Sequence, residues 1–401
     1  MGETAIAEYA LISDCHSAAL VSSAGSIDWL CRPRFDSPSI FGRLLDPSAG
    51  HFSIALASEF TATRRYLERT MVLETTFSAT DGTAVVIDAM ALDPTEHGHD
   101  LGAGAPRVLF RRILCNDGEV PILVEFAPRP EYGLISPLLI ATPDGVASRG
   151  GALRSLLSTD RTASIDGSTA TFEFTLKAGE SASFALQSRL SFDADQPQAW
   201  SQDQIASGID GTVEAWRTWS GVHQNYEGPW EDLVYHSGRV LQALMYQPTG
   251  AIVAAPTTSL PEEVGGERNW DYRYAWVRDA SFTLDALWVA ACPDEALKFF
   301  SWMTGAVASQ ISPNEPSHTC PDGGTAGRSG SATARGTSAS WTCTGSCWTR
   351  RTACATSSRR STTPPGPSWF RWPTRPPPGG RSRTRASGRS GANRGTSSTR
   401  S

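Results

Sequence analysis

Residues 269–282, which read NWDYRYAWVRDASF, combine side chains that are suited to holding a sugar. Five of the fourteen are aromatic, two are arginine and two are aspartate. A pyranose ring has a relatively apolar face that stacks on Trp or Tyr, and its hydroxyls form charge-assisted hydrogen bonds with Arg and Asp. The segment therefore favours a carbohydrate site. An aromatic core with ion pairs at its edge is the alternative interpretation.

Asp279 has a second, purely structural interpretation. It precedes an apolar stretch that predicts a helix over residues 280–290, and Asp is a preferred N-cap residue because its carboxylate accepts a hydrogen bond from a free backbone N–H. Both roles are open from the sequence alone.

Strand and turn signals fill the first 195 or so residues, which must support this segment. Asp-Gly or Asn-Asp-Gly turns at 81–82, 116–118 and 166–167 separate β-branched or alternating runs. Such turns are typical of β-hairpins, since both central residues must tolerate positive φ. We expect three hairpins here and, for residues 1–200, an antiparallel β-sandwich domain.

The pattern changes to a helical period from about residue 203. We expect a linker helix within residues 201–228 and then the beginning of an all-helical domain over 229–310. The fold class predicted for the chain is thus α+β and multidomain. Helical stretches are expected at 209–226, 230–246, 280–290 and 295–307.

Residues 323–401 differ sharply in composition from the rest of the chain. All 41 acidic residues lie at or before Asp322, whereas 14 of the 35 basic residues follow it. The later segment also lacks Leu, Ile, Val and Met, so it cannot bury enough apolar surface to offset its ordering entropy. We predict a disordered Arg/Pro/Ser-rich tail over residues 311–401. An arginine-rich arm that binds nucleic acid is the less favoured alternative, because the body of the chain is strongly acidic.

The start of the chain, MGETAIAEYA, lacks the basic and apolar regions of a signal peptide, and no stretch is apolar for long enough to span a membrane. We therefore expect a cytoplasmic protein with no membrane and no nucleic-acid partner. Cys15, Cys31, Cys115 and Cys292 stand alone in apolar segments and predict buried free thiols. The four cysteines of 320–354 match no zinc spacing, so we expect neither a metal nor an organic cofactor.

Two long motifs resemble a known family. The stretch TTSLPEEVGGERNWDYRYAWVRDASF, Thr257–Phe282, resembles the first sugar-binding loop of glycoside hydrolase family 15, which includes glucoamylases and bacterial trehalases. The run YALISDCHSAALVSSAGSIDWLCRPRFDSPSIFGRLLDPSAGHF, Tyr9–Phe52, resembles the trehalase-like N-terminal domain of its bacterial members, and Arg64–Phe77 continues that match.

The resemblance implies a β-supersandwich, a linker and an (α/α)6 barrel, of which this chain would hold an incomplete part. It also implies inverting hydrolysis of an α-glucosidic bond in trehalose or at an α-glucan end. In such a reaction one carboxylic acid protonates the leaving oxygen, and a carboxylate about 6.5–9.5 Å away activates water.

The family's substrate-binding roles would fall on four residues of the loop. Arg278 and Asp279 would hydrogen-bond the non-reducing glucose, Trp276 would lie alongside it, and Tyr272 would lie near the attacking water. Asp271, Arg273 and Tyr274 would support these residues from behind. None of these is the catalytic acid or base.

The two catalytic glutamates of the family are absent from the chain as it reads. Glu295 and Glu315 are the only glutamates after Glu267, and neither stands in a family-like context. Our hypothesis is that the tail is family sequence read out of frame. Back-translated into GC-rich codons and shifted by two bases, Arg385–Ser401 can give the family's Gly-Ile-Trp-Glu segment, and the same offset gives family-like sequence over 318–350.

Three classes of function stay open at this stage. The first is a hydrolase of this family, whose activity the missing glutamates would abolish in the chain as given. The second is a disaccharide phosphorylase built on the same plan, which would need phosphate as its nucleophile. The third is a non-catalytic module that binds an α-glucoside or oligosaccharide without cleaving it.

Overall fold

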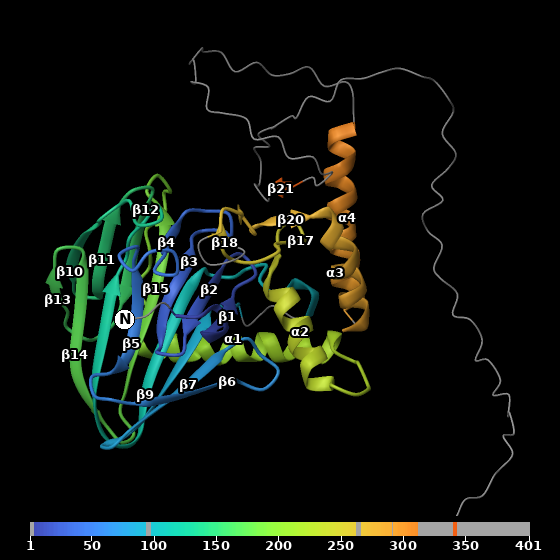
Figure 1. The fold of residues 1–401 in the computed structure, drawn as a ribbon. Coiled ribbons are helices and arrows are strands. Elements are labelled where there is room, and N and C mark those ends of the chain that lie inside the picture. The colour runs from blue at the N-terminus through green and yellow to red at the C-terminus, as the bar shows by residue number, and fades with distance from the viewer. Residues whose placement is uncertain (1–3, 94–97, 262–265, 291, 312–339, 343–401) are drawn as a thin grey trace, which may run out of the picture. The chain divides into compact units, whose positions relative to one another are not determined.

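A computed structural model describes residues 4–93, 98–261, 266–290, 292–311 and 340–342 (Figure 1). The chain forms strands almost continuously as far as Leu190 and is mainly helical from Gln202. The fifteen strands of the first part are all connected by antiparallel pairing. They are β1 (Tyr9–Ser13), β2 (Ala18–Ser22), β3 (Ser26–Cys31), β4 (Ser39–Phe41), β5 (His51–Leu56), β6 (Thr61–Tyr66), β7 (Leu73–Ala79), β8 (Gly82–Met90), β9 (Val108–Ala127), β10 (Leu138–Thr142), β11 (Gly145–Gly150), β12 (Leu153–Ser158), β13 (Ser164–Asp166), β14 (Thr169–Lys177) and β15 (Ser181–Leu190).

These strands form two layers that share β9. The first half of β9 pairs with β8 and β15, and its second half pairs with β5 and β14. The layers face each other across one apolar core, since Phe184 of β15 contacts Phe52 of β5 and Phe172 of β14 with ring centroids 6.2 and 5.5 Å apart. The prediction of a large antiparallel β domain followed by a few helices is confirmed.

Two of the three predicted hairpins are present. β7 and β8 pair up to Ala79 opposite Gly82, and β13 and β14 pair up to Asp166 opposite Thr169. The hairpin predicted around residues 116–118 is wrong, because β9 runs straight through them. The pairing of β8 with β9 slips by one residue beside Asn116. A bulge of this kind bends a strand without reversing it, which lets β9 pass from one layer to the other.

Arg111 of β9 is a fully buried cation that links both layers. Its Nε donates to Asp88 of β8 at 2.7 Å, and its Nη2 donates to the Gly25 carbonyl at 2.7 Å. Its Nη1 donates to the Phe52 carbonyl of the other layer. Every nitrogen of the guanidinium thus has a partner, which is the condition for burying this charge at tolerable cost.

Four helices follow the strands: α1 (Gln202–His223), α2 (Glu231–Ala243), α3 (Val277–Val289) and α4 (Pro293–Ile311). The helix predicted at 209–226 is α1. It begins earlier because Ser201 forms a capping box with Gln204, and it buries Trp216 and Trp219. Pro293 opens α4, as expected from its fixed φ.

The helix predicted over 230–246 ends early. α2 stops at Ala243, and the next residues form the short strand β16 (Met245–Tyr246), which pairs with β17 (Ala251–Ile252). Pro248 disfavours a helix in the residue before it, and Gly250 closes the turn with φ +79° and a hydrogen bond from its N–H to the Tyr246 carbonyl.

Large apolar side chains lie exposed on all three of the later helices. They are Trp230 and Leu233 at the start of α2, Phe282, Trp288 and Val289 of α3, and Leu297 and Phe300 of α4. Apolar surface of this kind normally packs against further structure. Exposed apolar surface is therefore present on α3 and α4 as well as at the start of α2.

Most of the tail for which we predicted disorder lies outside the described residues. Within it, Ser340–Thr342 forms the short strand β21 and pairs with β20 (Tyr274–Trp276). No helix among the described residues is long and apolar enough to cross a membrane.

Candidate functional site

The candidate sugar loop, residues 257–282, is built from short strands that lead into a helix. β18 (Leu260–Pro261) pairs with β19 (Asn269–Trp270), and the chain then turns at residues 271–273 into β20 and α3. The N–H groups of Ala254 and Ala255 donate to the carbonyls of Tyr274 and Tyr272 at 3.2 and 2.9 Å. The turn is thus held from one side by the segment that precedes the loop.

Arg273 fixes the same turn from the other side. Its guanidinium forms a two-point ion pair with Asp271, with distances of 2.9 Å from Nε to Oδ1 and 2.7 Å from Nη2 to Oδ2. Its Nη1 donates to the Ser37 carbonyl and the Tyr132 hydroxyl, each at 2.9 Å. The sugar loop is therefore tied to two loops of the β domain through one buried cation.

Electrostatics favour a permanent charge at this position. Burial alone would lower the pKa of Arg273, but its hydrogen bonds to Asp271 and the charge of that carboxylate raise it above its ordinary value. The nearby Cys31 thiol stays neutral, since burial raises its pKa to about 12. Arg273 is thus a structural cation that carries no proton-transfer chemistry.

A second contact joins the loop to the β domain. Trp29 of β3 is completely buried, and its Nε1 donates to the Pro256 carbonyl at 2.8 Å, one residue before the loop. Trp29 and Ser37 both belong to the stretch of residues 9–52 that also carries the resemblance, so this stretch supports the loop directly.

Of the four residues expected to bind sugar, the structure describes the side chains of three. Tyr272 lies at the turn, Trp276 at the end of β20 and Asp279 in the first turn of α3, and all three are half-buried. Arg278 belongs to α3, but its side chain lies outside the described part of the chain. The structure thus brings three of the four onto one short stretch next to the Arg273 anchor.

Trp276 is a donor that lacks a partner. Its ring lies edge-on to that of Trp270, with centroids 6.5 Å apart, and its Nε1 has no hydrogen-bond partner among the described residues. An indole offers an apolar face for stacking and one N–H for a polar ligand atom. This pair of rings has the chemistry that a pyranose needs.

Asp279 is not the N-cap of its helix. Trp276 occupies that position without a capping side chain, and Asp279 is the third helical residue. A carboxylate there still interacts favourably with the positive end of the helix dipole. The capping interpretation of Asp279 is therefore wrong, although its acidic character suits the first turn.

Two carboxylates in the described part of the chain, one in the loop and one in α4, already have partners. The carboxylate of Asp271 is engaged by Arg273, and Glu295 is buried in α4 against α1, where its Oε1 accepts from Trp219 Nε1 at 3.0 Å. Glu315 lies outside the described residues. Neither Asp271 nor Glu295 is therefore free to protonate a leaving group or to activate water.

Sequence reasoning placed Arg273 behind the binding residues but missed its partners. Tyr132 and Ser37 lie 141 and 236 residues away in the sequence, so no spacing pattern could connect them to the loop. The available signal was that Arg273 lies in an aromatic run with Asp271 on one side and Asp279 on the other. This arrangement indicates an ion pair but does not reveal the other partners of Arg273.

Comparison with known proteins agrees with this organisation. The family model described as "Trehalase-like, N-terminal" matches residues 1–173, and that described as "Glycosyl hydrolases family 15" matches residues 228–315. The chain is 36% identical over 318 residues to a trehalase of Mycolicibacterium smegmatis, covering 74% of this chain and 47% of that protein.

Other relatives carry the same name. A trehalase of Mycobacterium tuberculosis is 33% identical over 78% of this chain and 48% of its own length, and Trehalase 1 of Sulfolobus acidocaldarius is 33% identical over 73% and 47%. The chain therefore spans about half the length of the curated relatives it matches. A solved structure of a putative kojibiose phosphorylase from human microbiome covers 73% of this chain and 41% of its own at 11% identity, but its TM-score of 0.36 is too low to support an argument.

Both motifs noted in the sequence fall inside the matched regions, and the contacts of Arg273 and Trp29 join those regions in space. The chain thus contains a trehalase-like N-terminal domain followed by part of a glycosyl hydrolase family 15 domain.

Proposed function

We propose that this chain represents the substrate-holding part of an inverting hydrolase of α-glucosidic bonds, with trehalose as the first candidate substrate and α-glucan ends as the second. The trehalase relatives and the two family matches support the reaction class. In this proposal Tyr272, Trp276, Arg278 and Asp279 hold the non-reducing glucose.

The anchoring of the sugar loop is the observation that carries this proposal. Arg273 and Trp29 fix the loop against the β domain, which holds Tyr272 and Trp276 in place before any ligand arrives. A ligand then does not have to order these side chains, and a preorganised site loses less entropy on binding. Such anchoring is expected of a preorganised binding site.

We also propose that the 401-residue chain binds an α-glucoside without cleaving it. Inverting hydrolysis needs two carboxyl groups about 6.5–9.5 Å apart across the sugar. Asp271, within the loop, is held in an ion pair with Arg273, and the chain as it reads lacks the family's two catalytic glutamates. Loss of both members of an acid/base pair typically lowers the rate by orders of magnitude.

The origin of the tail forms the last part of the proposal. The family match ends at residue 315, close to the point where aliphatic and acidic residues disappear from the sequence. A change of reading frame near this point accounts for both facts. In the alternative frame, the codon of the catalytic acid would overlap those of Gly388 and Arg389.

The experiment compares two proteins made from one gene. The gene is sequenced across the codons for residues 300–401 and beyond, and both the present chain and a frame-restored version are purified. Each is incubated with trehalose and with maltotriose, and released glucose is measured. We expect glucose only from the frame-restored protein. Glucose release by the present chain, or stop codons throughout the alternative frame, would contradict the corresponding part of the proposal.

A further inference from the structure

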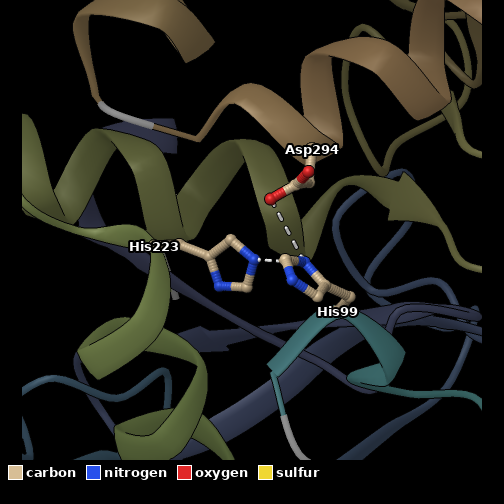
Figure 2. Close-up of side chains that lie close together, drawn as sticks. All are labelled: His99, His223 and Asp294. Atoms are coloured by element: carbon tan, nitrogen blue, oxygen red, sulfur yellow. Dashed lines mark hydrogen bonds and ion pairs between the residues drawn. The ribbon is translucent and has the colours of Figure 1, made fainter.

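We propose that a divalent transition-metal ion binds where three separate segments of the chain meet, with Zn²⁺ as the first candidate. Figure 2 shows His99, His223 and Asp294 with their side chains directed at one another. His99 comes from the short helix η2 (Gly98–Asp100), His223 from the last turn of α1, and Asp294 from the first turn of α4. One donor atom from each of the three lies within 4.8 Å of the others.

The spacing of these donor atoms fits a small ion. His223 Nε2 lies 2.7 Å from His99 Nδ1, and His99 Nδ1 lies 3.5 Å from Asp294 Oδ2. A tetrahedral Zn²⁺ with bonds of about 2.0–2.1 Å holds its ligand atoms roughly 3.3 Å apart. The two imidazoles would have to separate by only about 0.6 Å to admit the ion. The exposed position of His99 allows that movement.

His223 is already oriented as a metal ligand. It is 2% exposed, and its ring stacks on that of Trp219 with centroids 5.1 Å apart. Its Nδ1 lies 2.9 Å from the Trp219 carbonyl, which can only accept, so Nδ1 carries a proton and, in the neutral ring, Nε2 keeps its lone pair. Ligating histidines almost always donate their second N–H to such a carbonyl or carboxylate.

Glu295 supplies an independent reason to place a cation here. Its side chain is nine-tenths buried, and Oε1 lies 3.1 Å from His223 Nε2, so a lone pair faces a carboxylate at close range. Its other oxygen, Oε2, is buried and has no hydrogen-bond partner among the described residues. Buried carboxylate oxygens without partners are costly, and a cation bound beside His223 would lower that cost.

Charge and ligand type select the class of ion. In the cluster without a metal, the Nδ1–H of His99 donates to His223 Nε2, and a metal ion would replace that proton. The two carboxylates, Asp294 and Glu295, then balance the charge of one divalent cation. Two imidazole nitrogens favour Zn²⁺ and its transition-metal neighbours, whereas Mg²⁺ and Ca²⁺ prefer oxygen ligands alone.

The ion would act as a structural clamp, and this inference does not depend on the proposed glycosidase function. It would join the β domain through His99, α1 through His223, and the part matched by the hydrolase family through Asp294. This contradicts our expectation from the sequence that the chain has no metal. His99 and His223 are 124 residues apart, so no spacing motif could reveal them.

The test uses the complete 401-residue chain, freed of metal by chelation and dialysis. Co²⁺ is titrated while visible absorption is recorded, and Zn²⁺ is then added in competition while the thermal unfolding midpoint is followed. We expect one equivalent of Co²⁺ with the spectrum of nitrogen and oxygen ligands, its displacement by Zn²⁺, and a rise in the midpoint. His99→Ala and Asp294→Asn should each weaken binding at least about tenfold.

Both of these side chains are more than half exposed, at 56% and 54%, so their replacement should leave the fold intact. Two exposed residues provide matched controls: Asp100→Asn on η2 and Asp285→Asn on α3 should leave the affinity unchanged. The proposal is overturned if the folded chain binds no Co²⁺ or Zn²⁺, or if His99→Ala has no effect. It is also overturned if a thiolate-to-cobalt charge-transfer band shows that cysteines hold the ion.

Discussion

Arg273→Met tests whether one buried cation holds the sugar loop in place. The substitution keeps most of the apolar stem of the side chain but removes every donor. Asp271, the Ser37 carbonyl and the Tyr132 hydroxyl then lose a charged partner. Breaking a buried ion pair from one side costs roughly 3–5 kcal/mol. The Asp271 side chain is 21% exposed and can regain some water, so we expect about 3 kcal/mol, the lower end of that range.

Hydrogen exchange measures this loss where it should occur. The amides of Ala254 and Ala255 are protected by carbonyls of the turn that Arg273 anchors. A local loss of about 3 kcal/mol should speed their exchange roughly 100-fold, while core strands such as β9 keep their protection. Arg273→Met combined with Asp271→Asn should recover part of the loss, since the unpaired carboxylate is gone.

Arg65→Met is the matched control for this prediction. Arg65 also forms an ion pair, with Glu74, but its side chain is 69% exposed. Exposed pairs contribute little to stability, so exchange at residues 254–255 should not change. If Arg273→Met changes that exchange less than threefold, or no more than Arg65→Met does, the anchoring role assigned to Arg273 is refuted.

Three further predictions concern stability and are checked by chemical denaturation. Arg111→Met leaves Asp88 buried without its partner and should cost about 3–5 kcal/mol, and a loss under 1 kcal/mol would contradict the linking role of this pair. Ser201→Ala removes the capping box of α1 and should cost about 1 kcal/mol, whereas an unchanged midpoint would show that packing alone fixes the helix start. Burial holds the pKa of His51 at about 3, below its ordinary 6.5. As the pH falls, His51 is therefore protonated in the unfolded chain before it is protonated in the folded chain. Stability should therefore be full above pH 6.5 and fall as the pH drops toward 3, by up to ~1.4 kcal/mol per unit, and His51→Gln should flatten that slope.

Local signals in the sequence predicted the elements whose causes are local. The turn residues at 81–82 and 166–167 correctly predicted hairpins, and Pro293 correctly marked the start of α4. The same chemistry misled at residues 116–118. There, the chain continues through a bulge beside Asn116, with Gly118 at φ +75°, because the two halves of β9 find partners in different layers. Nothing within those residues distinguishes a bulge from a turn.

In the candidate site, too, features with local causes could be predicted from the sequence and contacts between distant residues could not. The aromatic and charged run that includes Trp276 and Asp279 could be predicted as a sugar-binding segment because its residues are contiguous. Its supports were not visible, since Tyr132 and Trp29 reach it only in the folded chain. The His99–His223 pair was missed for the same reason, as each histidine alone looks like an ordinary polar residue.

Saturation-transfer NMR of trehalose with the 401-residue chain tests the central claim most directly, because one sample reports binding and cleavage together. We predict saturation transfer to the trehalose protons and no glucose anomeric signals. Trp276→Ala should abolish the transfer, while Trp288→Ala, an exposed tryptophan of α3, should not. Equal transfer in wild type and Trp276→Ala, or the appearance of glucose, would contradict a loop that holds an α-glucoside without cutting it.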